Sequence, residues 1–448
     1  MEQLPLEVIG EILSRVEVAR HVVRASLTCH KWREAYCKHL HTLSFDVADD
    51  ERVYSRLPTS SLEILITRTI FQTSGLRKLS IRMHDNHKFS AGAAFGWLVF
   101  TRESLSELFF TVCTSPSIDV LDVCGRKKLK TMCLGECTIR NVEPVLQRFP
   151  CLTSLSLNRV SISVEDLNRL LLALPKLECL ELSEPELHAE DEVHIERFLK
   201  LQFPTLKTLL IRGLSELGLI LEKCDIGHLL VKNCTFGLFK VTGSKNLTHF
   251  EIYGSEFRLL EIEEADDLES LEIIHCRVSQ SNLFPMSVQA PKLKKFQIWG
   301  FMEQMECFKR ENEIILHGSS LVVDLERIAV CSPQLSHLSL FFEKGVVDVE
   351  YKFSGLSSLE NVVILHIGCD YYTRDYFHGF TEWAENLLKC CPNVRKLIVH
   401  GMVPEEKDDG FLEDLSEQTS MMFEMIRKYP HIEVKFKYMY RTLFRIYC

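Results

Sequence analysis

Cysteine and histidine are the side chains of this sequence that could do chemistry, and each occurs 17 times in 448 residues. Cys133 and Cys137 lie four positions apart, and His366 and Cys369 are close enough in sequence to touch. A zinc site needs more ligands than such a pair, and no C-x-x-C pair occurs. Motifs of the P-loop, G-x-S-x-G, H-E-x-x-H and G-x-G-x-x-G types are also absent from the sequence. We therefore expect no catalytic residues, no metal and no cofactor.

Composition and net charge limit the kinds of partner the protein can bind and the cellular compartment in which it is expected. The net charge of -10 argues against binding to nucleic acid or to an anionic membrane. An odd number of cysteines spread along the chain indicates reduced thiols rather than a disulfide framework. Glu2, Glu7 and Glu11 interrupt any secretory signal, and no apolar run could span a membrane. We expect a protein of the nucleus or cytoplasm that is not secreted.

An internal repeat of the form L-x-x-L-x-L, where L is any apolar residue, organises most of the chain. About fourteen copies occur between residues 40 and 399, among them "LTSLSL" (152–157), "LECLEL" (177–182) and "LESLEI" (268–273). Apolar residues at the fourth and sixth positions have period 2, which predicts a short strand with one buried face. In several copies Cys137, Cys234 or Cys276 follows three residues later, which completes the leucine-rich-repeat pattern.

The segments between these strands differ along the chain. Residues 163–174 predict a helix with Ser163 as N-cap and Asp166 in the capping-box position, and residues 380–391 predict another. The middle repeats are shorter, so residues 239–241 and 260–262 predict extended return legs. The fold class is therefore α/β: a curved parallel sheet with helices or extended legs on its convex side. An ordinary α/β domain with several buried strands is the alternative.

The ends and two irregular stretches complete the expected organisation. Residues 300–334 and 365–393 interrupt the repeat period, and their role stays open. Residues 404–417 predict an exposed loop leading to a helix at about 416–429, and 432–440 predict a terminal strand that caps the solenoid. The predicted domains are 1–39, a unit of short helices; 40–403, the repeats; and 404–448, a capping helix and strand.

The first residues predict three short amphipathic helices that bury too little surface to be stable without a neighbour or a partner. Leu4-Pro5, Glu7, Ile12-Leu13-Ser14, Val16, Cys29 and Trp32-Arg33 resemble the F-box motif. Together with the repeats, they identify the chain as similar to F-box/LRR-repeat proteins, which are abundant in plants. The resemblance implies a non-catalytic substrate-recognition subunit of an SCF-type (cullin-RING) ubiquitin ligase. Its F-box would bind a Skp-type adaptor, and its repeats would hold an unidentified protein substrate.

Carried over by position, the resemblance implies a set of adaptor-facing residues. Some of them must instead form the core of the three helices, and Trp32 fits either place. The set is Leu4, Pro5, Ile9, Ile12, Leu13, Val16, Cys29 and Trp32.

The third, fifth and seventh positions of each strand are expected on the concave face, where a substrate could bind. Aromatic and charged side chains there suit a protein-binding surface, although each could be a solvated strand residue. The candidates are Arg212, Lys232, Tyr253, Trp299, Phe341, Glu251 and Glu272. The competing hypothesis is a leucine-rich-repeat scaffold or small-molecule sensor whose first helices serve only as a cap.

Overall fold

The structure is a computed structural model with two compact units, which are described separately. The first unit comprises residues 1–199 and 205–214, and the second comprises 200–204 and 215–448. The described residues are 4–48, 54, 56–83, 86–124, 127–142, 149–188, 198–215, 217–278, 286–299, 321–342, 349–352, 358–370, 374–403 and 411–440. Among the helices of these residues, none combines the length and apolar character needed to cross a membrane.

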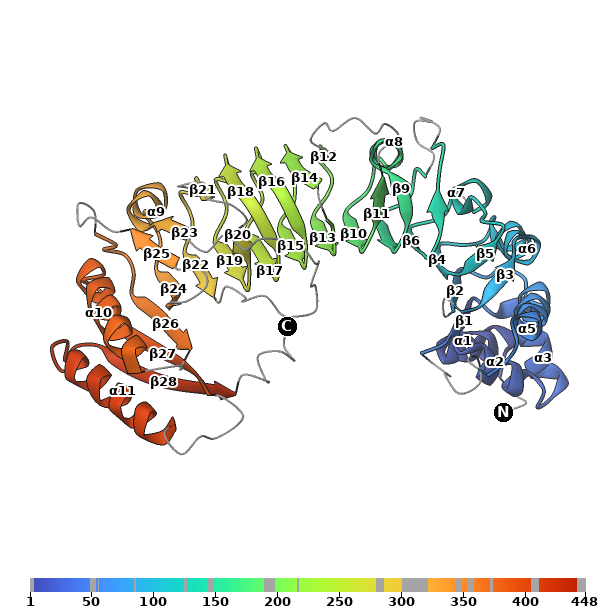
Figure 1. The fold of residues 1–448 in the computed structure, drawn as a ribbon. Coiled ribbons are helices and arrows are strands. Elements are labelled where there is room, and N and C mark those ends of the chain that lie inside the picture. Colours follow the sequence, from blue (N-terminus) through green and yellow to red (C-terminus); the bar gives the residue numbers. More distant parts are fainter. Residues whose placement is uncertain are drawn as a thin grey trace, which may run out of the picture. The chain divides into compact units, whose positions relative to one another are not determined.

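The first unit is built on a parallel sheet whose strands follow one another in chain order (Figure 1). Each strand pairs in register with the next, so that Leu79 lies beside Leu108 and Leu155 beside Leu180. The strands are β1 (Thr42–Asp46), β2 (Lys78–Arg82), β4 (Glu107–Thr111), β6 (Thr131–Gly135), β8 (Ser154–Asn158), β10 (Cys179–Ser183) and β13 (Thr208–Arg212). The predicted period-2 strands are confirmed: Leu155 and Leu157 are buried, whereas the alternate Ser154 and Ser156 are only half-buried.

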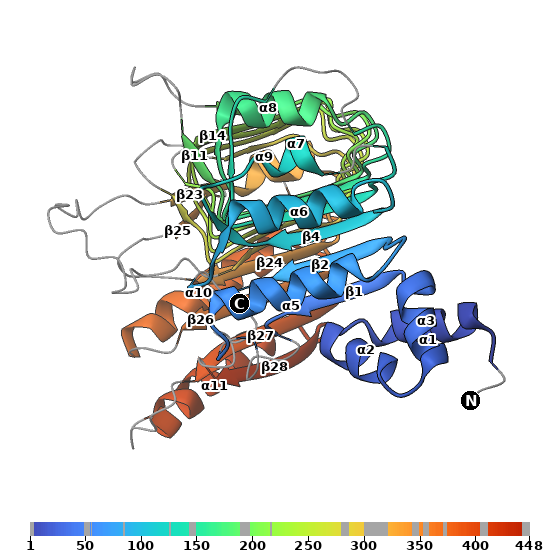
Figure 2. The ribbon, with the colours of Figure 1, turned by 90° about the vertical axis from the view of Figure 1, so that its right-hand side faces the viewer.

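Helices and short strands form the other side of this unit, and Figure 2 shows the helices stacked over the sheet. The helices are α5 (Thr59–Phe71), α6 (Ala91–Thr101), α7 (Val120–Val123) and α8 (Val164–Leu172). Two small parallel sheets join successive coils: β3 (Lys88–Ser90) with β5 (Cys113–Ser115), and β7 (Thr138–Ile139), β9 (Ser161–Ser163) and β11 (Glu186–His188). Strand β12 (Phe198–Leu201) contains residues of both units.

Helix α8 begins as predicted, because the Ser163 hydroxyl accepts the Asp166 backbone N–H at 3.0 Å. The Asp166 carboxylate, expected to complete a capping box, is used differently. It accepts the backbone N–H groups of Asn141 and Val142, at 3.0 and 2.9 Å, from the preceding coil. A residue placed by a local helix rule therefore joins two neighbouring coils.

The three predicted N-terminal helices are confirmed as α1 (Leu6–Val16), α2 (Ala19–Ser26) and α3 (His30–His39). Helix α1 packs so closely on α3 that a Cβ atom at Gly10 would lie 2.4 Å from the Cβ and the carbonyl oxygen of His39. The helices also join the first coil directly: the Tyr36 hydroxyl donates to the Thr69 carbonyl oxygen at 2.9 Å. The Glu17 carboxylate pairs with the Lys78 ammonium group at 3.2 Å.

The second unit has the same pattern, with a parallel sheet whose last four strands are longer (Figure 1). Its strands are β15 (His228–Lys232), β17 (His249–Tyr253), β19 (Ser270–Ile274), β22 (Lys295–Trp299), β24 (His337–Phe342), β26 (Ile364–Asp370), β27 (Lys396–Val403) and β28 (Glu433–Tyr440). Strand β28 confirms the predicted terminal strand. We call the face of this sheet that carries Lys295, His337 and Lys396 the inner face; Leu338 and Leu397 point to the opposite, buried side.

The middle coils of this unit return through strands, as predicted for 239–241 and 260–262. Strands β14 (Leu217–Glu222), β16 (Thr235–Thr242) and β18 (Glu256–Glu263) pair in parallel, and β20 (Arg277–Val278) and β21 (Met286–Val288) pair with β18. The core between the two sheets is aromatic: the rings of Phe239 and Phe250 meet edge to face at 5.3 Å. The buried turn residue Cys234 donates its S–H to the Lys232 carbonyl oxygen at 3.1 Å.

Helices return at the C-terminal end of the second unit, as α9 (Leu325–Cys331), α10 (Arg374–Cys390) and α11 (Phe411–Ile426), beside the strand pair β23 (Leu321–Asp324) and β25 (Val349–Lys352). Helix α10 confirms the helix predicted at 380–391. The start of the last helix was predicted wrongly: α11 already begins at Phe411, where we expected a loop. The predicted loop residues 404–410, and 300–320 of the first irregular stretch, lie outside the described residues.

Candidate functional site

An apolar stripe runs along the outside of α1. Val8, Ile12 and Val16 are spaced four residues apart, so they share one helix face, and 42%, 38% and 38% of their surfaces are exposed. Leu27, directly after α2, is 69% exposed. We call these four residues the N-terminal apolar surface. Clustered exposed apolar side chains of this kind are typical of a protein-binding surface.

The structure separates the predicted adaptor-facing residues into two groups. Pro5, Cys29, Ile12 and Val16 are exposed, and Leu4 and Trp32 are half-buried. Ile9 and Leu13 are completely buried, so neither can contact a partner in this arrangement. They lie on the face of α1 that carries Gly10, which packs against α3. Val8 and Leu27 were missed by the sequence reasoning; the four-residue spacing from Val8 to Ile12 was the available signal.

Six of the seven substrate-binding candidates lie on the inner face. Arg212 is exposed in the first unit; the other six belong to the second. Strand register brings Glu251 beside Glu272, and Glu272 forms an ion pair with Lys295. The Lys232 ammonium group lies 5.3 Å from the centre of the Tyr253 ring, within cation–π range. These side chains therefore form small local pairs along neighbouring strands.

Trp299 and Phe341 correct the expectation of exposed aromatic residues. They are only 5% and 2% exposed, and their ring centres lie 5.3 Å apart. Both rings cover Gly368, where an added Cβ would come within 2.8 Å of each. The ring of His400 meets Trp299 edge to face at 4.8 Å. The two aromatic residues thus form a packed layer of this face, and neither offers an open side to a substrate.

Two histidines of this face were not among the sequence candidates. His366 on β26 and His400 on β27 have ring centres 5.7 Å apart. Burial lowers the pKa of each histidine to about 4. Lys437 and other nearby cations also lower the pKa of His366. His366 and Lys437 likewise lower the pKa of His400. The basic residues alternating through 432–440 were the sequence signal for a charged surface here.

We expect the second unit to lose stability as the pH falls from about 6.5 towards 4. An unfolded histidine takes up a proton near pH 6.5, whereas folded His366 and His400 remain neutral until about pH 4. Protonation therefore favours the unfolded chain within this window. Thermal unfolding measured across it should show a smaller loss for His366→Gln/His400→Gln than for the unmodified chain. The exposed His431→Gln serves as the control and should leave the slope unchanged.

The cysteine and histidine pairs noted in the sequence do not form a reactive site. Burial raises the pKa of Cys133 and raises that of Cys137 to about 12, so both thiols stay protonated. The contact that the sequence allowed between His366 and Cys369 does not form, because residues three apart on a strand point to opposite faces. Cys369 instead accepts a hydrogen bond from the Gln418 amide on the buried side. Within the described ranges, no group of three potential metal ligands occurs.

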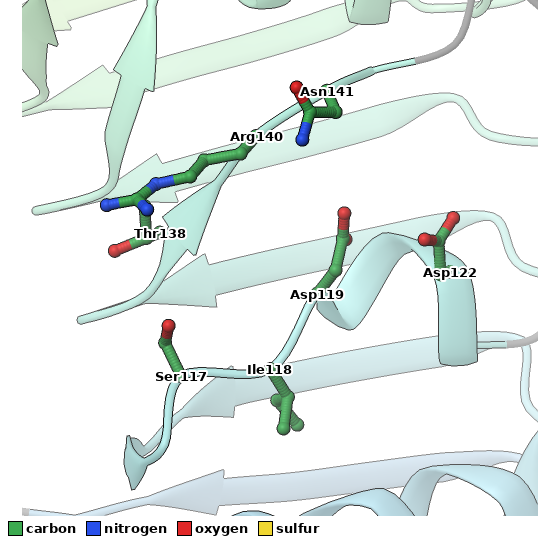
Figure 3. Close-up of a pocket in the computed structure, with 7 residues that line it drawn as sticks. All are labelled: Ser117, Ile118, Asp119, Asp122, Thr138, Arg140 and Asn141. Carbon is green, nitrogen blue, oxygen red and sulfur yellow. The ribbon is translucent and has the colours of Figure 1, made fainter.

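A polar pocket of about 430 Å³ lies beside α7 in the first unit (Figure 3). Its lining residues come from the segment before α7, from α7 and from the end of β7: Ser117, Ile118, Asp119, Asp122, Thr138, Arg140 and Asn141. Two of them stabilise the local fold. The Asp119 carboxylate caps α7 by accepting the Leu121 N–H at 2.9 Å, and the Asn141 N–H donates to Asp166.

Comparisons with known proteins match both parts of this arrangement. Residues 1–45 match the family described as F-box-like. Residues 96–197 match the family described as FBD-associated F-box protein At5g56370, LRR repeats. The F-box/LRR-repeat protein At1g67190 of Arabidopsis thaliana is 42% identical over 440 residues, which cover 98% of this chain and 100% of that protein.

Proposed function

Because this chain belongs to the F-box/LRR-repeat family, we propose that it is the substrate-recognition subunit of an SCF-type, cullin-RING ubiquitin ligase. In this role it is not an enzyme. Its F-box binds a Skp-type adaptor, and the inner face of its repeats binds the protein to be ubiquitinated. The proposal implies action in the nucleus or cytoplasm, and the domain limits 1–39, 40–403 and 404–448 remain predictions.

The observation that carries this proposal is the N-terminal apolar surface. Val8, Ile12 and Val16 stay exposed although the opposite face of α1, with Ile9, Gly10 and Leu13, is buried. Covering such a stripe with an apolar partner surface removes it from water, which favours association by about 25 cal/mol for each Å² buried. Clustered apolar anchors are also the side chains that contribute most to binding between proteins.

The direct contacts between the N-terminal helices and the repeats suit a receptor that works by proximity. The His41 backbone N–H donates to the Ser14 hydroxyl at 2.9 Å, and the Ser74 N–H donates to the Cys37 carbonyl oxygen at 2.9 Å. These bonds tie the adaptor-binding helices to the first coil without a flexible linker. A substrate on the repeats is then held at high effective concentration near the ubiquitin-loaded enzyme.

Binding to a purified Skp-type adaptor tests the proposal. We expect the full chain and the adaptor to elute as one complex in size-exclusion chromatography and to recruit a cullin-RING core. Failure to bind any Skp-type adaptor would overturn the proposal. The helices would then serve only as a cap on the sheet, a role compatible with the bridge between Val18 and Ser44.

A further inference from the structure

A cluster of basic residues occupies the inner face of the last strands of the second unit. In a chain with net charge -10, β22, β24, β26, β27 and β28 place four lysines and two acidic residues on this face by register: Lys295, Lys396, Lys435, Lys437, Glu433 and Asp370. His337, His366 and His400 lie among them. We call Lys396, Lys437 and these three histidines the basic inner surface. Its charge is opposite to that of the whole chain.

Two of the four lysines have carboxylate partners. Lys295 pairs with Glu272, and the Lys435 ammonium group lies 3.4 Å from the Glu433 carboxylate. Among the described residues, no carboxylate lies within ion-pair distance of Lys396 or Lys437. Lys437 is exposed and Lys396 is half-buried. Both charges can therefore act on a ligand that approaches this face.

Buried polar atoms also lie on this face. Ser339 is 5% exposed, and register places it beside His366. Its hydroxyl oxygen and both ring nitrogens of His400 are buried, and none has a hydrogen-bond partner among the described residues. Buried polar atoms are normally paired, because leaving one unpaired is energetically unfavourable. Because these atoms are enclosed and Ser339 lies two strands from Lys396, they take no part in binding at the surface, which is left to Lys396 and Lys437.

We propose that the basic inner surface binds an extended acidic segment of the recruited protein; this inference rests on the proposed function. Lys396 and Lys437 pair with two carboxylates of this segment. The Trp299 and Phe341 rings pack next to His400 and Gly368 and hold this part of the face rigid.

The strand register sets the spacing of the two carboxylates. Lys396 pairs with Glu433, so Lys437 lies one strand across and four residues further along. At about 3.3 Å per residue and 4.8 Å per strand, the two Cα atoms are about 14 Å apart. An extended peptide covers that distance in about four residues. The preferred ligand therefore carries acidic residues four positions apart rather than adjacent ones.

Fluorescence anisotropy with a labelled peptide tests this surface. The probe is an extended peptide with glutamates four positions apart, and its glutamine version controls for charge. We expect the full chain to bind the acidic probe and the Lys396→Gln/Lys437→Gln variant to bind it at least about tenfold more weakly. The matched control is Lys223→Gln/Lys245→Gln, which removes the same charge from exposed residues outside the inner face and should bind normally.

Three results would overturn the inference: no binding of the acidic probe, equal weakening by both double variants, or tighter binding of a single-stranded RNA of equal charge. Adaptor binding by the same variants separates this inference from the proposed function. If Lys396→Gln/Lys437→Gln and the unmodified chain both bind the adaptor but neither responds to the probe, only the acidic-segment inference falls. If the probe binds as expected and no adaptor does, only the proposed function falls.

Discussion

Ile12→Asp is expected to weaken binding of the Skp-type adaptor at least about 100-fold, a loss of about 2.7 kcal/mol in binding free energy. Ile12 lies at the centre of the exposed stripe on α1, between Val8 and Val16. A carboxylate at this position would lose its hydration when the partner covers it. An apolar partner surface offers no cation to offset this desolvation cost. Isothermal titration calorimetry with the purified adaptor measures the loss.

The matched control is Ile64→Asp on α5. Ile64 is 53% exposed, so this variant makes the same chemical change at an exposed position outside the N-terminal helices. We expect it to bind the adaptor like the unmodified chain. Thermal unfolding of both variants should stay close to that of the unmodified chain, because neither side chain is buried. Unchanged adaptor affinity in Ile12→Asp would refute the assignment of this stripe.

Gly10→Ala is expected to destabilise the N-terminal helices by about 3 kcal/mol and to weaken adaptor binding as a consequence. The new Cβ would lie 2.4 Å from the Cβ and the carbonyl oxygen of His39, and backbone atoms cannot rotate away as a flexible side chain does. Helix α1 must therefore shift off α3, which is the overpacking penalty of a close-packed core. Chemical denaturation, followed by limited proteolysis of the N-terminal segment, measures the effect.

Gly92→Ala on α6 is the control for this change. A Cβ at Gly92 meets no atom within 4 Å, and alanine is the better helix former by about 0.5–1 kcal/mol. This variant should be as stable as the unmodified chain or slightly more stable. The Ile12→Asp and Gly10→Ala variants should also differ from each other: Ile12→Asp should lose adaptor binding while it stays folded, whereas Gly10→Ala should lose both stability and adaptor binding. A fully stable Gly10→Ala chain would show that the α1–α3 contact is looser than described.

Local patterns predicted most of the architecture correctly. The alternation of apolar and polar residues in "LTSLSL" was sufficient to predict strand β8. Ser163 before an amphipathic segment was sufficient to predict where α8 begins. Such features depend on residues a few positions apart, so they can be recognised without the fold. The start of α11 was predicted too late in the sequence. The charged residues near it are as compatible with an exposed loop as with the solvent-exposed first turn of a helix.

The candidate sites depended on contacts that local patterns do not contain. The N-terminal motif located the N-terminal apolar surface, but its spacing could not separate exposed Ile12 from buried Ile9 and Leu13, because that depends on how α1 packs against α3. Likewise, Lys396 and Lys437 lie on one face, about four residues apart, only because β27 pairs with β28 in one register.

The sequence by itself determined the repeated strands, the N-terminal helices and the family to which the chain belongs, since each is a pattern of apolar side chains with a short period. Only the tertiary structure decided which side chains remain open to a partner. Trp299 shows the reason: it is buried because Gly368, 69 positions later and two strands away, leaves room for its ring. Exposure is set by neighbours in space, and those neighbours are distant in sequence.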